Sequence, residues 1–210
     1  MSYLQHISDY VQIGKSDLVQ KEIQEALNSG VSAQDILNDG LLDGMGKLGV
    51  RFKNNEVYVP EVLIAARALN RGLEILKPYL IEAGVEPIGK VVLATVKGDL
   101  HDIGKNLVKM MLVGAGFEVI DLGTDVPDAI IVEAIQKHKP NILALSALLT
   151  TTMAAQGDVI KALKAAGLRE SVKVMVGGAP ITQSFCDSIG ADAYTSDAAS
   201  CAEVAKTFIA

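Results

Sequence analysis

The sequence predicts an α/β protein in two parts, a four-helix bundle followed by a doubly wound parallel sheet of five strands. Two observations predict this class. Apolar residues recur at steps of three and four through residues 1–83, which is the period of amphipathic helices. From residue 90 onward, five short apolar runs alternate with helical stretches, as expected for strands buried on both faces of a parallel sheet. We expect a helical domain over residues 1–86 and an α/β domain over residues 87–210.

The first part contains four predicted helices. The first covers residues 3–13, and the second, "DLVQKEIQEALNSG", has Gly30 in place to end it. The third, "VSAQDILNDGLLDGMGKLG", starts with Ser32 as its N-cap. The fourth has Pro60 in its first turn, where the missing N–H costs nothing, and keeps one apolar seam as far as Leu80. Four such helices favour a small bundle.

The second part contains five predicted strands and five predicted helices. The strands cover residues 90–95, 117–121, 141–146, 172–176 and 192–194. The helices that follow them cover residues 103–115, 127–138, 151–167, 180–189 and 197–208. Five such units in this length fit a flavodoxin-like domain with strand order 2-1-3-4-5.

Composition narrows the class of partner. Half of the residues are hydrophobic, and the net charge of −6 is spread along the chain without a basic cluster. We therefore expect no nucleic-acid partner and no membrane partner. The opening "MSYLQHISDY" has neither a basic nor an apolar signal region, and Cys186 and Cys201 lack metal-type spacing. These features predict a cytoplasmic protein.

The loop after the first strand, "KGDLHDIG", holds Asp99 and His101 between two glycines, Gly98 and Gly104. In open parallel sheets, ligands bind outside the carboxyl ends of the strands where the strand order reverses, here between the first and third strands. A carboxylate that accepts the N–H of one ring nitrogen leaves the other nitrogen able to coordinate a metal. The same residues would also fit a histidine that caps the following helix or binds within its own loop.

Other sites that use this edge fit less well. A phosphate-binding loop would not place Asp99 and Asp102 beside a phosphate, and the dinucleotide pattern G-x-G-x-x-G is absent from the loop. A phosphorelay receiver requires an aspartate after the third strand, where this chain has Ser146. Asp121 and Asp125 follow the second strand near the same edge, and we interpret them as turn and N-cap residues.

Three short fragments carry a resemblance to a known family. Asp99–Gly104 match D-x-H-x-x-G, Ser146–Leu148 match S-x-L, and Gly177 and Gly178 supply a later G-G. In this order the fragments resemble the motif of the cobalamin-binding family that includes the corrinoid module of methionine synthase. The segment "GLLDGMGKLGVRFKNNEVYVPEVLIAARAL" resembles the helical cap of these proteins. The whole chain resembles the small corrinoid proteins of anaerobic methyltransferase systems that serve methylamines, methanol or methoxylated aromatics.

The resemblance implies roles for individual residues. His101 would be the lower axial ligand to the cobalt of a cobalamin or related corrinoid, replacing the cofactor's own base (base-off, His-on). Asp99 would hydrogen-bond the His101 ring, and Thr152 stands where a serine continues this relay in methionine synthase.

The resemblance also implies a set of corrinoid contacts. Those along the displaced nucleotide tail are Gly104, Ser146, Leu148, Gly177 and Gly178. Further contacts on the same edge are Asp102, Ile103 and Thr150, and an apolar lid from the helical part is formed by Met45, Val50 and Val59.

The function that the resemblance implies is methyl transfer by a carrier rather than by a complete enzyme. The carrier would accept a methyl group on cobalt(I) from a substrate-specific methyltransferase and deliver it to a second methyltransferase, with tetrahydrofolate or coenzyme M as acceptor. A reductive activator of cobalt(II) is a further implied partner. Two alternatives stay open: a cobalamin-dependent sensor or regulator, which would be expected to carry an output domain, and a small subunit of an adenosylcobalamin mutase, which would be expected to lack this cap.

Overall fold

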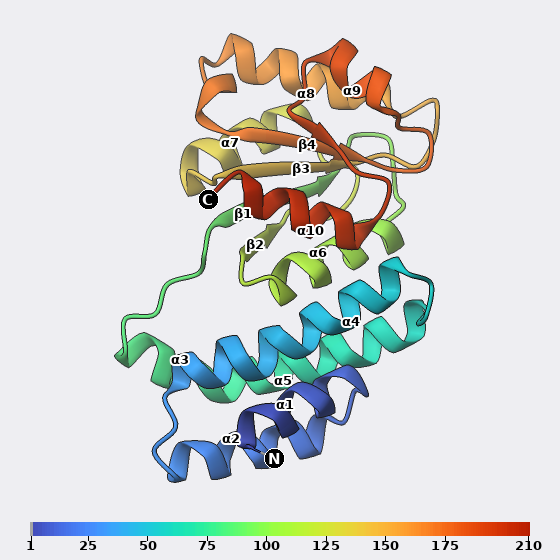
Figure 1. Ribbon diagram of the computed structural model, residues 1–210. Coiled ribbons are helices and arrows are strands. Elements are labelled where there is room, and N and C mark those ends of the chain that lie inside the picture. The colour runs from blue at the N-terminus through green and yellow to red at the C-terminus, as the bar shows by residue number, and fades with distance from the viewer. Residues whose placement is uncertain (1) are drawn as a thin grey trace. The chain divides into compact units, whose positions relative to one another are not determined.

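The computed structural model describes residues 2–210 and divides into two compact units (Figure 1). A helical unit extends to Pro87, and an α/β unit begins at Ile88. The predicted fold class is confirmed, since a helical cap precedes a five-stranded parallel sheet.

The helical unit contains the four predicted helices, with one unexpected feature. Its elements are α1 (Tyr3–Gln12), α2 (Ser16–Asn28), α3 (Ala33–Asp35), η1 (Ile36–Leu42), α4 (Asp43–Lys53) and α5 (Val59–Glu82). The third predicted helix is a continuous run of α3, η1 and α4, of which η1 is a π-helix. Ser32 caps this run as predicted, accepting the backbone N–H of Asp35 at 3.0 Å.

Two glycines explain how this run packs against α1. A Cβ at Gly40 would lie 3.0 Å from Cγ2 of Ile7, and one at Gly44 would lie 2.6 Å from the carbonyl oxygen of Ser8. Only glycine lets the two helix backbones approach this closely. Helix α5 continues past Pro78, and its buried face includes Val62, Leu69 and Leu76.

The α/β unit has the predicted order of elements. Its strands are β1 (Lys90–Thr95), β2 (Glu118–Asp121), β3 (Ile142–Ser146), β4 (Lys173–Gly177) and β5 (Ala193–Tyr194). Its helices are α6 (Ile103–Gly114), α7 (Asp128–His138), α8 (Ala154–Ala165), the short 3₁₀ helix η2 (Arg169–Ser171), α9 (Gln183–Ile189) and α10 (Ala198–Thr207). All neighbouring strands are parallel, in the order β2-β1-β3-β4-β5.

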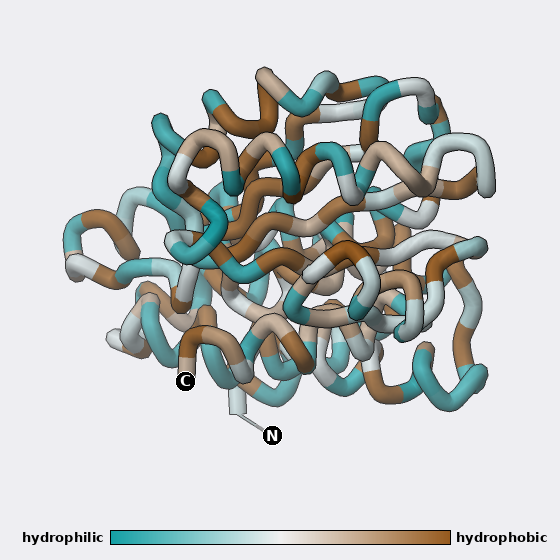
Figure 2. The backbone as a smooth tube through the Cα atoms, turned by 90° about the horizontal axis from the view of Figure 1, so that it is seen from above, coloured by the Kyte–Doolittle hydropathy of each residue, from teal (hydrophilic) through white to brown (hydrophobic). Residues whose placement is uncertain are grey.

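The sheet is covered on both faces, with α7, α8 and α9 on one side and α6 and α10 on the other (Figure 1). Alternate residues of each strand supply the two cores, so that Val92, Ala94, Leu143 and Val174 pack beneath α7, α8 and α9. The strands appear as brown, apolar segments in the interior of the tube drawing (Figure 2). Burial on both faces is why these strands lack the alternation of a half-exposed sheet.

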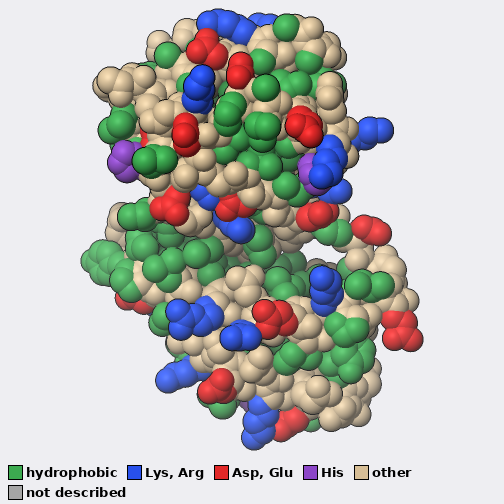
Figure 3. Space-filling model, turned by 180° about the vertical axis from the view of Figure 1, so that it is seen from behind, with side chains coloured by type: hydrophobic (Ala, Val, Ile, Leu, Met, Phe, Trp, Pro, Cys, Tyr) green, Lys and Arg blue, Asp and Glu red, His purple; other side chains and the backbone are tan. Residues whose placement is uncertain are grey.

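Charged side chains are distributed over both units. On the face seen in Figure 3, basic and acidic side chains are interspersed. Within residues 2–210, no helix combines the length and the apolar character required to cross a bilayer.

Candidate functional site

The candidate site lies at the carboxyl edge of the sheet, where the last residues of three adjacent strands are in register. Thr95 of β1 pairs with Ser146 of β3, which pairs with Gly177 of β4. Because β1 lies between β2 and β3, the strand order reverses here and the loops after β1 and β3 meet. These are the loops that carry the D-x-H-x-x-G and S-x-L fragments.

Asp99 is the centre of this arrangement and is fully buried. Its Oδ1 accepts the backbone N–H of His101 at 3.0 Å and is 2.7 Å from Nδ1 of the same ring. Its Oδ2 accepts the hydroxyl of Thr152 at 2.6 Å and the backbone N–H of Leu148 at 2.7 Å. One carboxylate therefore ties the loop after β1 to the loop after β3.

The protonation state of Asp99 follows from these contacts. Burial alone would raise the pKa of its carboxyl group, but the hydrogen bonds from Thr152 and from the backbone N–H groups of His101 and Leu148 stabilise the charged form. They hold the pKa well below its usual range. An ionised carboxylate only accepts hydrogen bonds, so Nδ1 of His101 must carry the proton that it shares with Asp99.

His101 consequently presents its other nitrogen, Nε2, as a lone-pair donor. The side chain is 49 % exposed, and Nε2 makes no hydrogen bond to any residue in the range 2–210. The hydroxyl of buried Thr95 donates to the carbonyl oxygen of His101 at 2.9 Å, which holds the backbone as Asp99 holds the ring. The result is a fixed, outward-facing imidazole with one available metal-donor atom.

The surroundings of His101 are apolar and exposed, as a large flat cofactor would require. Leu100 and Ile103 are each 73 % exposed, and Leu148 and Leu149 are each 42 % exposed. Exposed leucine and isoleucine side chains in the two loops that meet at His101 favour a binding surface over an ordinary solvent face. A macrocycle that brings its own equatorial ligands needs one axial nitrogen and apolar contact area, so the residues present fit a corrinoid.

The remaining predicted residues of this edge have distinct positions. Asp102 accepts the side-chain amide of Asn106 at 3.0 Å, and Thr150 is exposed in the loop after β3. A Cβ at Gly104 would meet no atom within 4 Å, so that its surroundings are open. The half-buried Ser146 ends β3.

Gly177, the last residue of β4, and Gly178, which follows it, have different surroundings. A Cβ at Gly177 would come no closer than 3.8 Å to another atom, the carbonyl oxygen of Thr195. Gly178 has φ of +130°, and a Cβ there would overlap the carbonyl oxygen of Ala147. Gly178 is therefore required by the backbone packing of the loops after β3 and β4.

The predicted lid residues belong to the helical unit. Met45 is buried in α4, Val50 of the same helix is 54 % exposed, and Val59 is the first residue of α5. Their contact with a cofactor stays a prediction.

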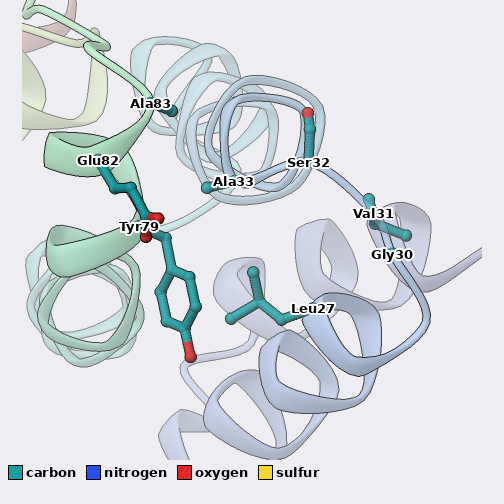
Figure 4. Close-up of a pocket in the computed structure, with 8 residues that line it drawn as sticks. All are labelled: Leu27, Gly30, Val31, Ser32, Ala33, Tyr79, Glu82 and Ala83. Carbon is teal, nitrogen blue, oxygen red and sulfur yellow. The ribbon is translucent and has the colours of Figure 1, made fainter.

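The helical unit also contains a separate pocket of about 370 Å³ between α2, the start of α3 and the end of α5 (Figure 4). Its walls are mainly apolar, and Tyr79 and Leu27 face each other across it. None of its lining residues is a predicted site residue. It is lined by Leu27, Gly30, Val31, Ser32, Ala33, Tyr79, Glu82 and Ala83.

Several contacts of the His101 loop were not predicted from the sequence. As turn residues, Asp121 accepts the N–H of Gly123 at 3.0 Å and Asp125 lies in the bend before α7. The N-cap of α7 is Pro127, however, and the Asp125 carboxylate accepts the N–H of Gly98 at 2.7 Å. Asp121 pairs with buried Lys105, with both carboxylate oxygens 2.8 Å from Nζ. A lysine four residues after His101 indicates that a carboxylate could pair with it, but which carboxylate does so depends on the tertiary structure.

Taken together, the site defines a class of protein: a doubly wound α/β domain with an outward histidine nitrogen on an apolar edge at its switch point. Two families, each described as a B12 binding domain, match the chain, one over residues 89–204 and one over residues 3–77.

Known relatives specify the class further. The chain is 44 % identical over 180 residues to trimethylamine corrinoid protein 1 of Methanosarcina acetivorans, covering 85 % of this chain and 83 % of the relative. It is 42 % identical over 208 residues to dimethylamine corrinoid protein 1 of the same organism, covering 99 % and 97 %. Among solved structures, the methanol:cobalamin methyltransferase complex MtaBC of Methanosarcina barkeri aligns with a TM-score of 0.89 and 32 % identity, over 99 % of this chain and 79 % of that one. The chain therefore belongs to the B12-binding corrinoid proteins of the methylamine and methanol methyltransferase systems, which confirms the predicted resemblance.

Proposed function

We propose that the chain binds its corrinoid in the base-off, His-on mode, with Nε2 of His101 as the lower axial ligand, and that it carries methyl groups between two methyltransferases. The observation that carries this proposal is the half-exposed His101, whose Nδ1 is held by buried, ionised Asp99 while Nε2 faces outward. When bound, the corrinoid supplies the cobalt centre that accepts and releases the methyl group.

The residues of the chain control the basicity of the axial nitrogen. Asp99 accepts a hydrogen bond from the Nδ1–H of His101 and so raises the electron density of the ring at Nε2. If Nε2 takes up a proton in place of a metal, the ionised carboxylate stabilises the imidazolium charge. Thr152 donates to the other oxygen of Asp99 at 2.6 Å, which adjusts how strongly Asp99 attracts the histidine proton.

Other residues would shape the binding surface. Leu148 and Ile103 supply exposed apolar area beside His101, and the open space at Gly104 suits the close passage of the nucleotide tail. Contact of Met45, Val50 and Val59 with the corrinoid is part of the same proposal. The names of the relatives favour methylamines as the source of the methyl group. Delivery by a substrate-specific methyltransferase, a second methyltransferase as acceptor and a reductive activator for oxidised cobalt belong to the same proposal.

The test is an ultraviolet–visible spectrum after reconstitution with hydroxocobalamin, with wild type and His101→Ala side by side. We expect stoichiometric binding by the wild type with a nitrogen-ligated spectrum, and a base-off spectrum for His101→Ala. Identical spectra would remove the axial role of His101. The methylated wild-type protein should then lose its methyl group to coenzyme M or tetrahydrofolate only when a second methyltransferase is added.

A further inference from the structure

We infer that Asp121 and Asp125, at the end of β2 and in the loop after it, are positioning residues that hold the His101 loop from both sides. Neither belongs to the three motif fragments. The inference rests on the proposed function, because its consequence is the orientation of an axial histidine. It is carried by two sets of contacts, one before His101 in the chain and one after it.

The first set fixes the backbone before His101. Oδ1 of Asp125 accepts the N–H of Gly98 at 2.7 Å, and the N–H of Asp125 donates to the carbonyl oxygen of Asp99 at 2.9 Å. These reciprocal bonds hold the peptide segment from which the Asp99 carboxylate projects. A shift of that segment would move the carboxylate and with it the His101 ring.

The backbone conformation of Asp125 indicates that its hydrogen bonds to Gly98 and Asp99 are a specific feature of the fold. Its φ is +52°, in the left-handed region where side chains other than glycine, asparagine and aspartate are disfavoured. Hydrogen bonds on both sides determine this backbone geometry, because Val126, the next residue, also donates its N–H to the carbonyl oxygen of Thr95 at 3.1 Å. Local strain of this kind persists where neighbouring contacts over-determine the backbone.

The second set fixes the start of α6, after His101. Lys105 is 3 % exposed, and its ammonium contacts both oxygens of Asp121 at 2.8 Å. It also donates to the side-chain oxygen of Asn106 at 2.8 Å, whose amide donates to Asp102, the residue after His101. A chain of polar contacts therefore runs from the end of β2 to the residue that follows the axial histidine.

Asp121 is 16 % exposed and also lies 3.2 Å from Nζ of the half-exposed Lys109, but Lys105 is buried, and burying one charge of an ion pair is a costly way to stabilise a fold. Replacing such a pair by apolar side chains of similar size is often neutral or stabilising. The geometry that the pair specifies, a fixed register of the first turn of α6 against β2, is the property that an apolar pair would not supply. The two contact sets together leave the loop between Gly98 and Lys105 little freedom to rotate.

Two substitutions at Asp125 separate the side-chain contact from backbone strain. Asp125→Gly removes the acceptor for the Gly98 N–H but tolerates the positive φ. Asp125→Asn retains both an acceptor oxygen and tolerance of positive φ. Each protein is reconstituted with hydroxocobalamin and reduced to cobalt(II), and the ratio of His-on to base-off cofactor is measured from the nitrogen splitting in the electron paramagnetic resonance spectrum.

We expect Asp125→Gly to lower that ratio about tenfold, the size typical of a lost contact behind a metal ligand. Asp125→Asn should stay within about twofold of wild type, because the hydrogen bond is retained. Hydrogen–deuterium exchange of the apoprotein gives a readout without cofactor: the peptide that covers residues 96–104 should exchange faster in Asp125→Gly.

The other contact set is tested by the double variant Lys105→Met/Asp121→Asn, which removes both charges of the Lys105–Asp121 pair and leaves only the half-exposed Lys109 without its Asp121 contact. It should also lower the His-on ratio. The matched control is Asp192→Asn, which removes a carboxylate from an ion pair at the opposite edge of the sheet and should leave the ratio unchanged.

The outcomes separate this inference from the proposed function. If His101→Ala changes the spectrum but Asp125→Gly and the double variant keep the wild-type ratio, positioning is refuted and axial ligation stands. If Asp192→Asn lowers the ratio as much as Asp125→Gly does, the effect is general destabilisation and positioning is refuted again. If His101→Ala matches wild type, axial ligation fails and positioning fails with it.

Discussion

Asp99 and Asp192 are carboxylates of one sheet, at opposite ends of its strands, and each contacts three neighbouring residues. Asp192, which precedes β5 at the amino edge, accepts the guanidinium of Arg169 at 2.7 Å, the ammonium of Lys173 at 3.4 Å and the N–H of Val174 at 2.7 Å. These three contacts of Asp192 connect it only to neighbouring residues of the α/β unit. Asp99 also binds three neighbours, but one of them is a side chain with a second nitrogen that faces outward. Hydrogen bonds to a carboxylate can therefore stabilise the fold at either end of the strands. A binding site requires in addition that one of the donors, here His101, has a second polar atom that no residue of the fold uses.

Asp99→Asn should have the largest effect. The substitution removes a charge and leaves an amide N–H₂ facing donors in a buried position, so we expect unfolding free energy to fall by about 3 kcal/mol. The His-on spectrum of the reconstituted protein should also weaken. Urea denaturation of the apoprotein and the cobalt(II) spectrum measure the two effects.

The comparison supplies the control for this prediction. Asp192→Asn is the same chemical change at the other edge, and it should cost about 2 kcal/mol while leaving the cofactor spectrum as in wild type. A change in the spectrum of Asp192→Asn equal to that of Asp99→Asn would show that the two edges do not differ in function.

Thr152→Val should have a smaller effect. Valine has the shape of threonine but cannot donate to Oδ2 of Asp99, which then keeps only the Leu148 N–H on that oxygen. We expect a loss of about 1 kcal/mol in unfolding free energy. Thr152→Ser retains the hydroxyl and should give a cofactor spectrum close to that of wild type, so equal spectra for Val and Ser would contradict a role for the hydroxyl.

The smallest expected effect is on the pH dependence of stability, through Asp192 at the amino ends of the strands. Burial alone would raise the pKa of Asp192, but the Val174 N–H and the Arg169 guanidinium stabilise the charged form and hold that pKa below its usual range. The unfolded chain has an ordinary pKa near 3.9, so the unfolded state binds more protons in this region. The stabilisation is therefore present above about pH 4 and is lost as pH falls toward the folded pKa. Urea denaturation from about pH 5 to about pH 3 should show a flatter loss of stability for Asp192→Asn than for wild type; a parallel loss would contradict this assignment.

Strand positions were predictable because their signal is local. The apolar runs around Val92 and Leu143 are continuous, since each strand is buried on both faces, and the observed strand order is the predicted one. The π-helix at Ile36–Leu42 was not predicted, because the periodicity of its apolar residues resembles that of an α-helix.

At the site, the motif predicted His101, Asp99 and the hydrogen bond between them, and Thr152 was expected to continue that relay. The remaining partners could not be predicted. The donor from Leu148 is a backbone N–H, which any residue type would supply, and its approach to Asp99 depends on how two loops meet. Lys105 of α6 pairs with Asp121 of β2. The sequence shows only that the two residues have opposite charges, not that they are in contact. Contacts of this kind come from tertiary structure.

The hydrogen bonds of Asp99 to Leu148 and Thr152 span 49 and 53 residues of chain, and this separation bears on biosynthesis. As the polypeptide leaves the ribosome, the helical unit and then β1 and β2 emerge before the residues that complete the carboxylate's environment. A nascent chain that ends before residue 148 would have His101 but neither of these two hydrogen bonds, so the orientation of the ring by Asp99 is completed only after β3 and the loop that follows it have been synthesised.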